Sequence, residues 1–154
     1  MRFTVSAEQL KFFHLNGYLQ LENLISEEEV DHLTVALAAL CTKSPGYTAE
    51  NCFRSVPLIA SLARTRGWGH ITSDLLHKKP LRIAYDRFWS QTPEFTRELG
   101  KEDCGFVLNL RTRQGIFFKN SLPDALNGET QDVYLLLILT AKHLPESLNP
   151  LIVR

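Results

Sequence analysis

The sequence predicts an α+β fold in which N-terminal helices pack on a C-terminal β-sheet. Helix signals fill residues 1–79, and strand signals fill residues 80–154. Runs of helices followed by runs of strands are typical of this class. At 154 residues, 44% of them hydrophobic, the chain is long enough to bury one core without disulfides, so we expect a single domain over residues 1–154.

The most informative stretch contains a strand and a capped helix in readable order. Residues 18–21, YLQL, form a short β-prone run. Ser26 is well placed as the N-cap of a helix running to about Cys41, and Glu29 can reach back to the cap. The acidic first turn is therefore helix-start chemistry rather than a site. Apolar residues recur at helical spacing and predict one buried face: Val30, Leu33, Leu37 and Leu40.

Three further helices are predicted. Ser6 and Gln9 form a second capping box before a helix that ends near Asn16. Pro57–Thr65 is a helix with proline in its first turn, where proline is tolerated, and residues 70–77 form another short helix. The inner face of the first helix is expected to carry Leu10, Phe13 and His14, with His14 as a structural histidine.

Strand signals follow from residue 80. Residues 80–89 alternate, which places Leu81, Ile83 and Tyr85 on one face and Arg82, Ala84 and Asp86 on the other. Asp86, between two arginines, is expected to be ion-paired. Residues 105–112 and 115–119 predict two more strands. The nearly continuous apolar run at 132–141 predicts a central strand that is buried on both faces.

Charge and cysteine content exclude several classes of function. Lys+Arg and Asp+Glu are both 17, which argues against a general nucleic-acid or anionic-membrane surface. Cys41, Cys52 and Cys104 fit reduced thiols better than a disulfide framework. The N-terminus lacks a secretory signal core, and no apolar run is long enough to span a membrane. We therefore expect a soluble cytoplasmic protein that binds neither nucleic acid nor membrane.

Three stretches resemble the phytanoyl-CoA dioxygenase-like (PhyH-like) family. They are the GYLQL strand with its SEEE helix start, the pattern DLL-x-x-x-PLRI-x-YDRFW at residues 74–89, and GIFFKNSLPDALNGET at residues 115–130. The resemblance implies helices packed on a double-stranded β-helix, a cupin- or jelly-roll-like sheet core. Residues 87–114 leave less room than the family gives to its metal-binding hairpin, so we expect a reduced barrel.

The iron motif of that family is absent. The resemblance implies an Fe(II) site made by His-x-Asp/Glu and a distant His, with 2-oxoglutarate anchored by an Arg. Asp124 stands where the distant His would be, and Lys142 is the nearest substitute for the Arg. No histidine begins a His-x-Asp/Glu motif, because the residues two positions later are Asn16, Thr34, Thr72, Lys79 and Pro145.

We therefore predict a non-catalytic domain, without metal or cofactor, that binds a small apolar ligand or a protein partner. The alternative is an Fe(II)/2-oxoglutarate-dependent oxygenase with a non-standard site. Its ligands would be Asp124 together with Asp86 or a histidine, either His70 or His143.

Other candidate residues have simpler interpretations. His70 and Asp74, four apart on one helix face, more simply form a structural hydrogen bond than part of a metal site. Cys52 and Cys104 are potential nucleophiles, although inert buried thiols are the default. A third hypothesis is an interaction subunit, which could be a homodimer, that uses exposed aromatic residues: Phe88, Trp89 and Trp68.

Overall fold

The computed structural model describes residues 4–40, 49–89, 99–123, 133–142 and 151–152. The helices are α1 (Ala7–Asn16), α2 (Glu27–Leu40), the 3-10 helix η1 (Cys52–Arg54), α3 (Pro57–Thr65) and α4 (Trp68–Leu76). The strands are β1 (Tyr18–Leu21), β2 (Ala49–Glu50), β3 (Arg82–Trp89), β4 (Asp103–Asn109), β5 (Gly115–Phe118), β6 (Tyr134–Thr140) and β7 (Leu151–Ile152). None of the helices within these ranges is both long and apolar enough to cross a bilayer.

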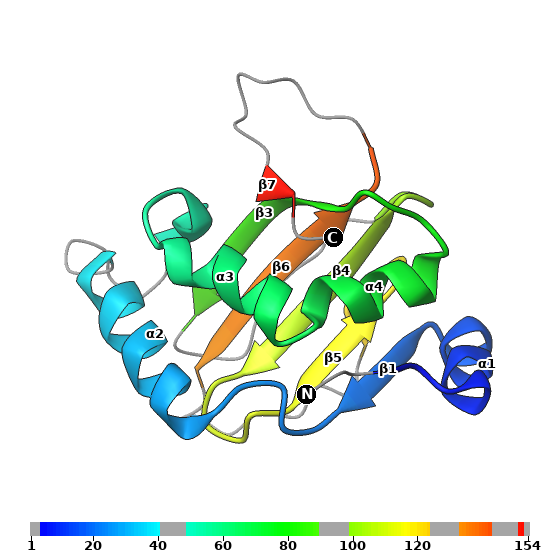
Figure 1. The fold of residues 1–154 in the computed structure, drawn as a ribbon, viewed down its shortest axis with the longest axis horizontal. Coiled ribbons are helices and arrows are strands. Elements are labelled where there is room, and N and C mark those ends of the chain that lie inside the picture. The colour runs from blue at the N-terminus through cyan, green and yellow to red at the C-terminus, as the bar shows by residue number, and fades with distance from the viewer. Residues whose placement is uncertain (1–3, 41–48, 90–98, 124–132, 143–150, 153–154) are drawn as a thin grey trace.

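The strands form one antiparallel sheet in the order β1-β5-β4-β6-β3-β2, and β7 also pairs with β3. Helices α3 and α4 lie across one face of this sheet, while α1 and α2 lie toward its two ends (Figure 1). The predicted α+β class is confirmed.

Both predicted capping boxes are present at the helix starts. The backbone N–H of Gln9 donates to Ser6 Oγ, and the Ser6 N–H donates to Gln9 Oε1. The N–H of Glu29 donates to Ser26 Oγ at 3.1 Å, and Glu29 Oε1 accepts the Ser26 N–H at 3.0 Å. These bonds satisfy backbone donors that a helix leaves free in its first turn. The acidic start of α2 is thus helix-start chemistry, as predicted.

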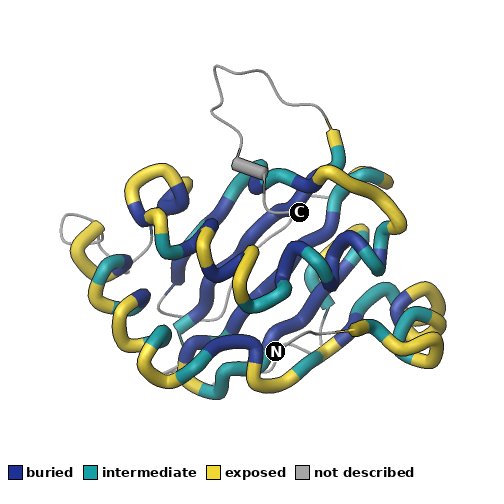
Figure 2. Tube along the Cα trace, in the orientation of Figure 1, coloured by how far each residue is buried: buried dark blue, intermediate teal, exposed yellow. Residues whose placement is uncertain are grey.

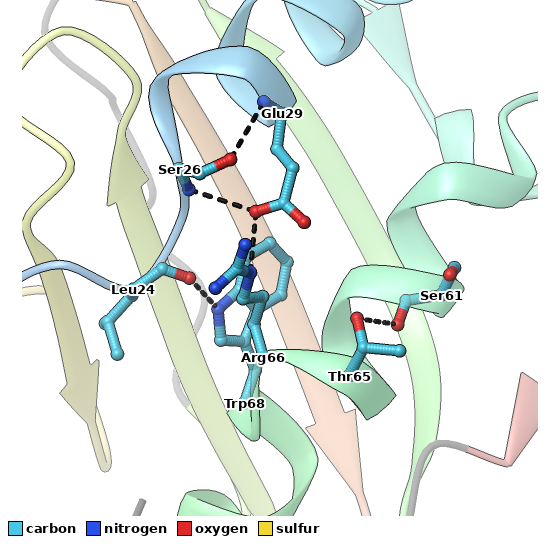
Figure 3. Close-up of polar contacts among 7 residues, drawn as sticks. All are labelled: Leu24, Ser26, Glu29, Ser61, Thr65, Arg66 and Trp68. Carbon is cyan, nitrogen blue, oxygen red and sulfur yellow. Dashed lines mark hydrogen bonds and ion pairs between the residues drawn. The ribbon is translucent and has the colours of Figure 1, made fainter. Parts of the chain in front are cut away.

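Glu29 also ties α2 to the junction of α3 and α4 (Figure 3). Its carboxylate accepts a 2.6 Å bond from Arg66 Nε, and the adjacent Trp68 donates its indole N–H to the Leu24 carbonyl at 2.8 Å. Burial alone would raise the pKa of Glu29, but the bonds from Ser26 and Arg66 hold this pKa below its ordinary 4.5. Glu29 is therefore ionised at neutral pH and serves two structural contacts.

The sheet is buried on both faces, as the dark strands in Figure 2 indicate. The larger core lies between the sheet and the helices and contains Leu33, Trp68 and Phe106. The opposite face, which we call the second face, carries a smaller apolar cluster. Six residues, each at most 5% exposed, form the second face: Trp89, Val107, Phe118, Tyr134, Leu136 and Ile138.

A β-bulge in β3 changes which residues share a face. The register against β6 shifts between Ile83 and Tyr85, so one extra residue interrupts the alternation. Tyr85 packs against the second face, whereas Asp86 contacts η1 and Phe88 packs in the helix-side core. The predicted faces of this strand are correct through Ala84 and wrong from Tyr85 onward, because strict alternation does not allow for a bulge.

Several smaller expectations also need correction. Leu40 is 41% exposed instead of buried, and His14 is exposed instead of facing inward. Helix α4 begins at Trp68, two residues early, because Gly67 adopts a left-handed conformation as its N-cap. Strand β4 ends at Asn109, whose side-chain oxygen accepts two backbone N–H bonds and turns the chain.

Gly105 tests how tightly the second face is packed. A Cβ built at this position would overlap the ring of Phe118, which is fully buried on the neighbouring strand. We expect Gly105→Ala to lower the free energy of unfolding by about 1–3 kcal/mol, measured by urea denaturation, because the ring has no space to move into. Gly100→Ala is the matched control, since its Cβ would meet only Asp103 Oδ2 at 3.4 Å. Equal stability of the two variants would show that the second face is loosely packed.

Candidate functional site

The second face, on the side of the sheet away from the helices, is the first surface to consider for a site. Neighbouring strands bring its residues into rows across the sheet. Phe118 lies opposite Gly105, Gly105 opposite Ile138, and Ile138 opposite Tyr85. The Phe118 ring covers the position where Gly105 has no side chain. Large apolar side chains thus occupy this surface.

Asp86, a candidate metal ligand, lies on the other side of the sheet and has a structural role. Its side chain is fully buried, and its two oxygens accept backbone N–H bonds from Cys52 and Phe53, each at 2.6 Å. The Asp86 carbonyl also accepts the Asn51 N–H at 2.9 Å. Asp86 therefore caps η1 and fixes it to β3. The expectation of an ion pair is wrong, because backbone N–H groups supply its partners.

The environment of Asp86 affects its charge in two opposing ways. Burial raises the pKa of Asp86 above its ordinary 3.8, although the bonds from Cys52 and Phe53 act to lower it. Both carboxylate oxygens of Asp86 are engaged by η1, and no two other described His, Cys, Asp or Glu side chains group with it as metal ligands.

His70 is also poorly placed for a shared site. It lies on α4 and pairs with Asp74, Nε2 to Oδ2, at 3.5 Å, as the four-residue spacing suggested. Both side chains are partly exposed on the helix layer, away from the second face. Within the described residues, no three His, Cys, Asp or Glu side chains are grouped as metal ligands. The described residues therefore do not fit an iron triad.

Asp124 and His143 lie outside the described residues. Lys142, the nearest substitute for an anchoring arginine, is exposed just beyond β6. Strand β6 itself carries no basic residue and is buried along its whole length.

Arg87 of β3 was not predicted from the sequence as part of the second face. Arg87 lies opposite Leu136, its guanidinium is 4.9 Å from the Trp89 ring centroid, and its Nε is 3.8 Å from Glu50 Oε1. Arg87 Nε is buried and makes no hydrogen bond with the residues that the structure describes. The sequence pattern that could have predicted this position is the two-residue spacing of Arg87 and Trp89, which places both side chains on one face of a strand. Arg87 is thus a cationic group beside the apolar cluster.

The cysteines do not provide a nucleophile within the described residues. Cys52 and Cys104 are free thiols and both are buried. Burial raises the pKa of Cys104 to about 12, so the reactive thiolate is not populated at neutral pH.

The aromatic residues proposed for an exposed interaction surface are buried. Trp68 is 0%, Phe88 4% and Trp89 5% exposed, because helix packing covers the first two and the second-face cluster covers Trp89. The third hypothesis is therefore wrong in its residues. Exposed large apolar side chains in the described chain are instead Phe12, Leu15, Val35 and Leu40.

Asp86→Asn tests the structural role of this carboxylate. An amide can accept only one of the two N–H bonds and would place its NH2 against the other donor. We expect a loss of about 1–3 kcal/mol in the free energy of unfolding and faster labelling of Cys52 by a thiol reagent, mapped by peptide mass spectrometry. Asp74→Asn, on the partly exposed surface of α4, should change neither. Unchanged Cys52 labelling in Asp86→Asn would contradict the capping role.

Comparisons with known proteins establish the fold. No protein-family model matches the chain, and no curated protein matches it. CT296 from Chlamydia trachomatis is 19% identical with a TM-score of 0.79, over 92% of this chain and 99% of CT296. EctD from S. alaskensis, with bound Fe, is 16% identical with a TM-score of 0.68, over 99% of this chain and 89% of EctD.

A third solved structure is HygX from Streptomyces hygroscopicus with nickel and 2-oxoglutarate bound. It is 13% identical with a TM-score of 0.65, over 93% of this chain and 90% of HygX. Identities this low are informative about fold and not about activity. The chain has the α+β, jelly-roll-like fold of EctD and HygX.

Proposed function

We propose that this chain is a non-catalytic binding domain built on a jelly-roll-like oxygenase scaffold. The observation that carries the proposal is the filled second face, where Trp89, Phe118 and Tyr134 are each at most 5% exposed. A non-haem iron site needs imidazole and carboxylate ligands with open coordination positions. Among the described residues of this cluster, no side chain is an imidazole or a carboxylate, which supports the proposal. The proposal includes no resident metal or cofactor.

The alternative function is an Fe(II)/2-oxoglutarate-dependent oxygenase with a non-standard site. It is supported by the fold shared with EctD bound to Fe and HygX bound to nickel and 2-oxoglutarate. Asp86 and His70 do not support it, because Asp86 caps η1 and His70 pairs with Asp74. This alternative therefore depends on Asp124 and His143 as ligands.

Among binding functions, the geometry favours a protein partner over an apolar small ligand inside the barrel. The second face is occupied by its own side chains, whereas α1 exposes Phe12 and Leu15, which are 42% and 74% exposed. These residues are three apart on α1, beside a groove of about 410 Å³ between α1 and β1. Apolar side chains next to an end strand favour pairing with another strand.

We infer that the partner is a second copy of this chain. Strand β1 ends the sheet among the described strands, and two such strands can pair antiparallel across a two-fold axis. The buried free thiols Cys52 and Cys104 fit a reducing compartment, so we propose that this homodimer is cytoplasmic.

Addition of metal and cosubstrate separates the two functions. The protein is purified without a metal-affinity tag, its iron content is measured, and its melting temperature is followed with anaerobic Fe(II) and 2-oxoglutarate. A ligand that binds only the folded state must raise the melting temperature. We expect no bound iron and no shift. Bound iron with a further shift from 2-oxoglutarate would contradict the proposal, and loss of that shift in Asp124→Ala but not in Asp74→Ala would assign the ligand.

The proposed dimer is tested by a pair of matched surface variants. Leu15 and Val35 are 74% and 73% exposed, on α1 and α2 respectively, so charges introduced there should affect folding equally little. We expect Leu15→Glu to weaken self-association about tenfold or more in sedimentation equilibrium, because a carboxylate would be desolvated at the contact. Val35→Glu should associate like the original protein. A monomeric original protein, or equal behaviour of both variants, would contradict a dimer through α1.

A further inference from the structure

A second candidate site lies at the C-terminal end of β5, on the helix side of the sheet. A cleft of about 300 Å³ opens between the ends of α1 and α4, the start of β4 and the residues after β5. Its apolar wall is formed by Phe13, Leu75 and Leu76. Its polar rim includes His14, Lys101 and Lys119. The cleft therefore combines an apolar surface with cationic side chains.

Lys119 is held in position at this rim. Its Nζ donates to the His14 carbonyl at 3.2 Å and lies 5.6 Å from the centroid of the Phe13 ring. The first contact places the ammonium at the C-terminal end of α1, where positive charge is favoured. An ammonium has three N–H donors, and this carbonyl uses one of them. Because Lys119 is already held in place, little further side-chain entropy would be lost when it binds a ligand.

Two imidazoles lie beside the same cleft. The ring of His14 stacks on that of His77 with centroids 6.3 Å apart and an interplanar angle of 17°. His77 is the C-cap of α4 and has a left-handed backbone, with φ of 54°. Both residues are exposed, so their ring N–H groups can donate to a ligand at the mouth of the cleft.

The local charge balance is positive although the chain as a whole is neutral. Among the described residues that line the cleft, Asp103 is the carboxylate, and its Oδ2 accepts the Gly100 N–H at 3.0 Å. Nearby, Lys78 and Glu102 balance each other, with Nζ 3.9 Å from Oε1. Lys101 and Lys119 therefore outnumber the carboxylate of the cleft, and the two histidines add N–H donors.

We propose that this cleft binds a small organic anion with a phosphate or carboxylate head and an apolar body. The head would contact Lys101 and Lys119, which supply charge-assisted hydrogen bonds, and the body would lie on Phe13, Leu75 and Leu76. A volume of about 300 Å³ holds a compact molecule of this kind. The site is on the opposite side of the sheet from the second face, so the proposal does not depend on the absence of iron chemistry.

Phenyl phosphate is the probe that tests the proposal, because it carries a dianionic head on one aromatic ring. Titrations followed by amide chemical shifts use phenyl phosphate, inorganic phosphate and phenol, each in the presence of a chelator. We expect phenyl phosphate to change the amide chemical shifts of His14, Gly100 and Lys119. Phenyl phosphate should bind more tightly than inorganic phosphate, and phenol should bind most weakly of the three. Benzoate in place of phenyl phosphate distinguishes a carboxylate head from a phosphate head.

Charge-removal variants locate the binding. Lys101→Met, at an exposed residue with no described contact to lose, should weaken phenyl phosphate binding about tenfold. Lys119→Met should weaken it further, and its folding is checked by the amide spectrum. Arg64→Met removes one charge from α3, which does not line the cleft, and should leave binding unchanged. Equal losses for Lys101→Met and Arg64→Met would overturn the proposal. Amide shifts confined to residues outside the cleft would also overturn it.

Discussion

Two-sided burial of strand β6 is the constraint on which the rest of the structure depends. All residues from Tyr134 to Thr140 are buried, and the strand pairs with β3 on one side and β4 on the other. A strand that is apolar on both faces must have both faces covered. Helices α3 and α4 cover one face (Figure 1). On the other face, side chains of β3, β4, β5 and β6 form the second-face cluster, and Leu99 and Leu122 pack against it from outside the sheet. The described side chains of the second face therefore serve the packing of the sheet.

Periodicity and capping in the sequence were sufficient to predict most of the fold. The helices starting after Ser6 and Ser26 and the buried strand around residues 134–140 follow from local signals, and local signals do not depend on distant contacts. The bulge in β3 could not be predicted, because it depends on register against β6. The short elements β2 and η1 were missed because Asp86 holds η1 from across the chain.

The site was harder to predict than the fold because side-chain type does not reveal direction. Asp86 looked like a metal ligand or an ion-paired residue, yet one bulge turns it toward η1. Trp68 looked like an exposed aromatic residue, yet its indole N–H donates to the Leu24 carbonyl inside the core. The cationic cleft at Lys101 and Lys119 joins residues from α1, α4, β4 and the end of β5, so no linear motif marks it.

The central claim is that the second face is packed with the protein's own side chains and is not a metal site. The most direct measurement is a crystal structure grown anaerobically with Fe(II) and 2-oxoglutarate, with an anomalous difference map recorded at the iron absorption edge. The account predicts Trp89, Phe118 and Tyr134 in contact across the second face and no iron peak there. An iron peak bordered by protein ligands on that face, with those side chains displaced, would contradict it.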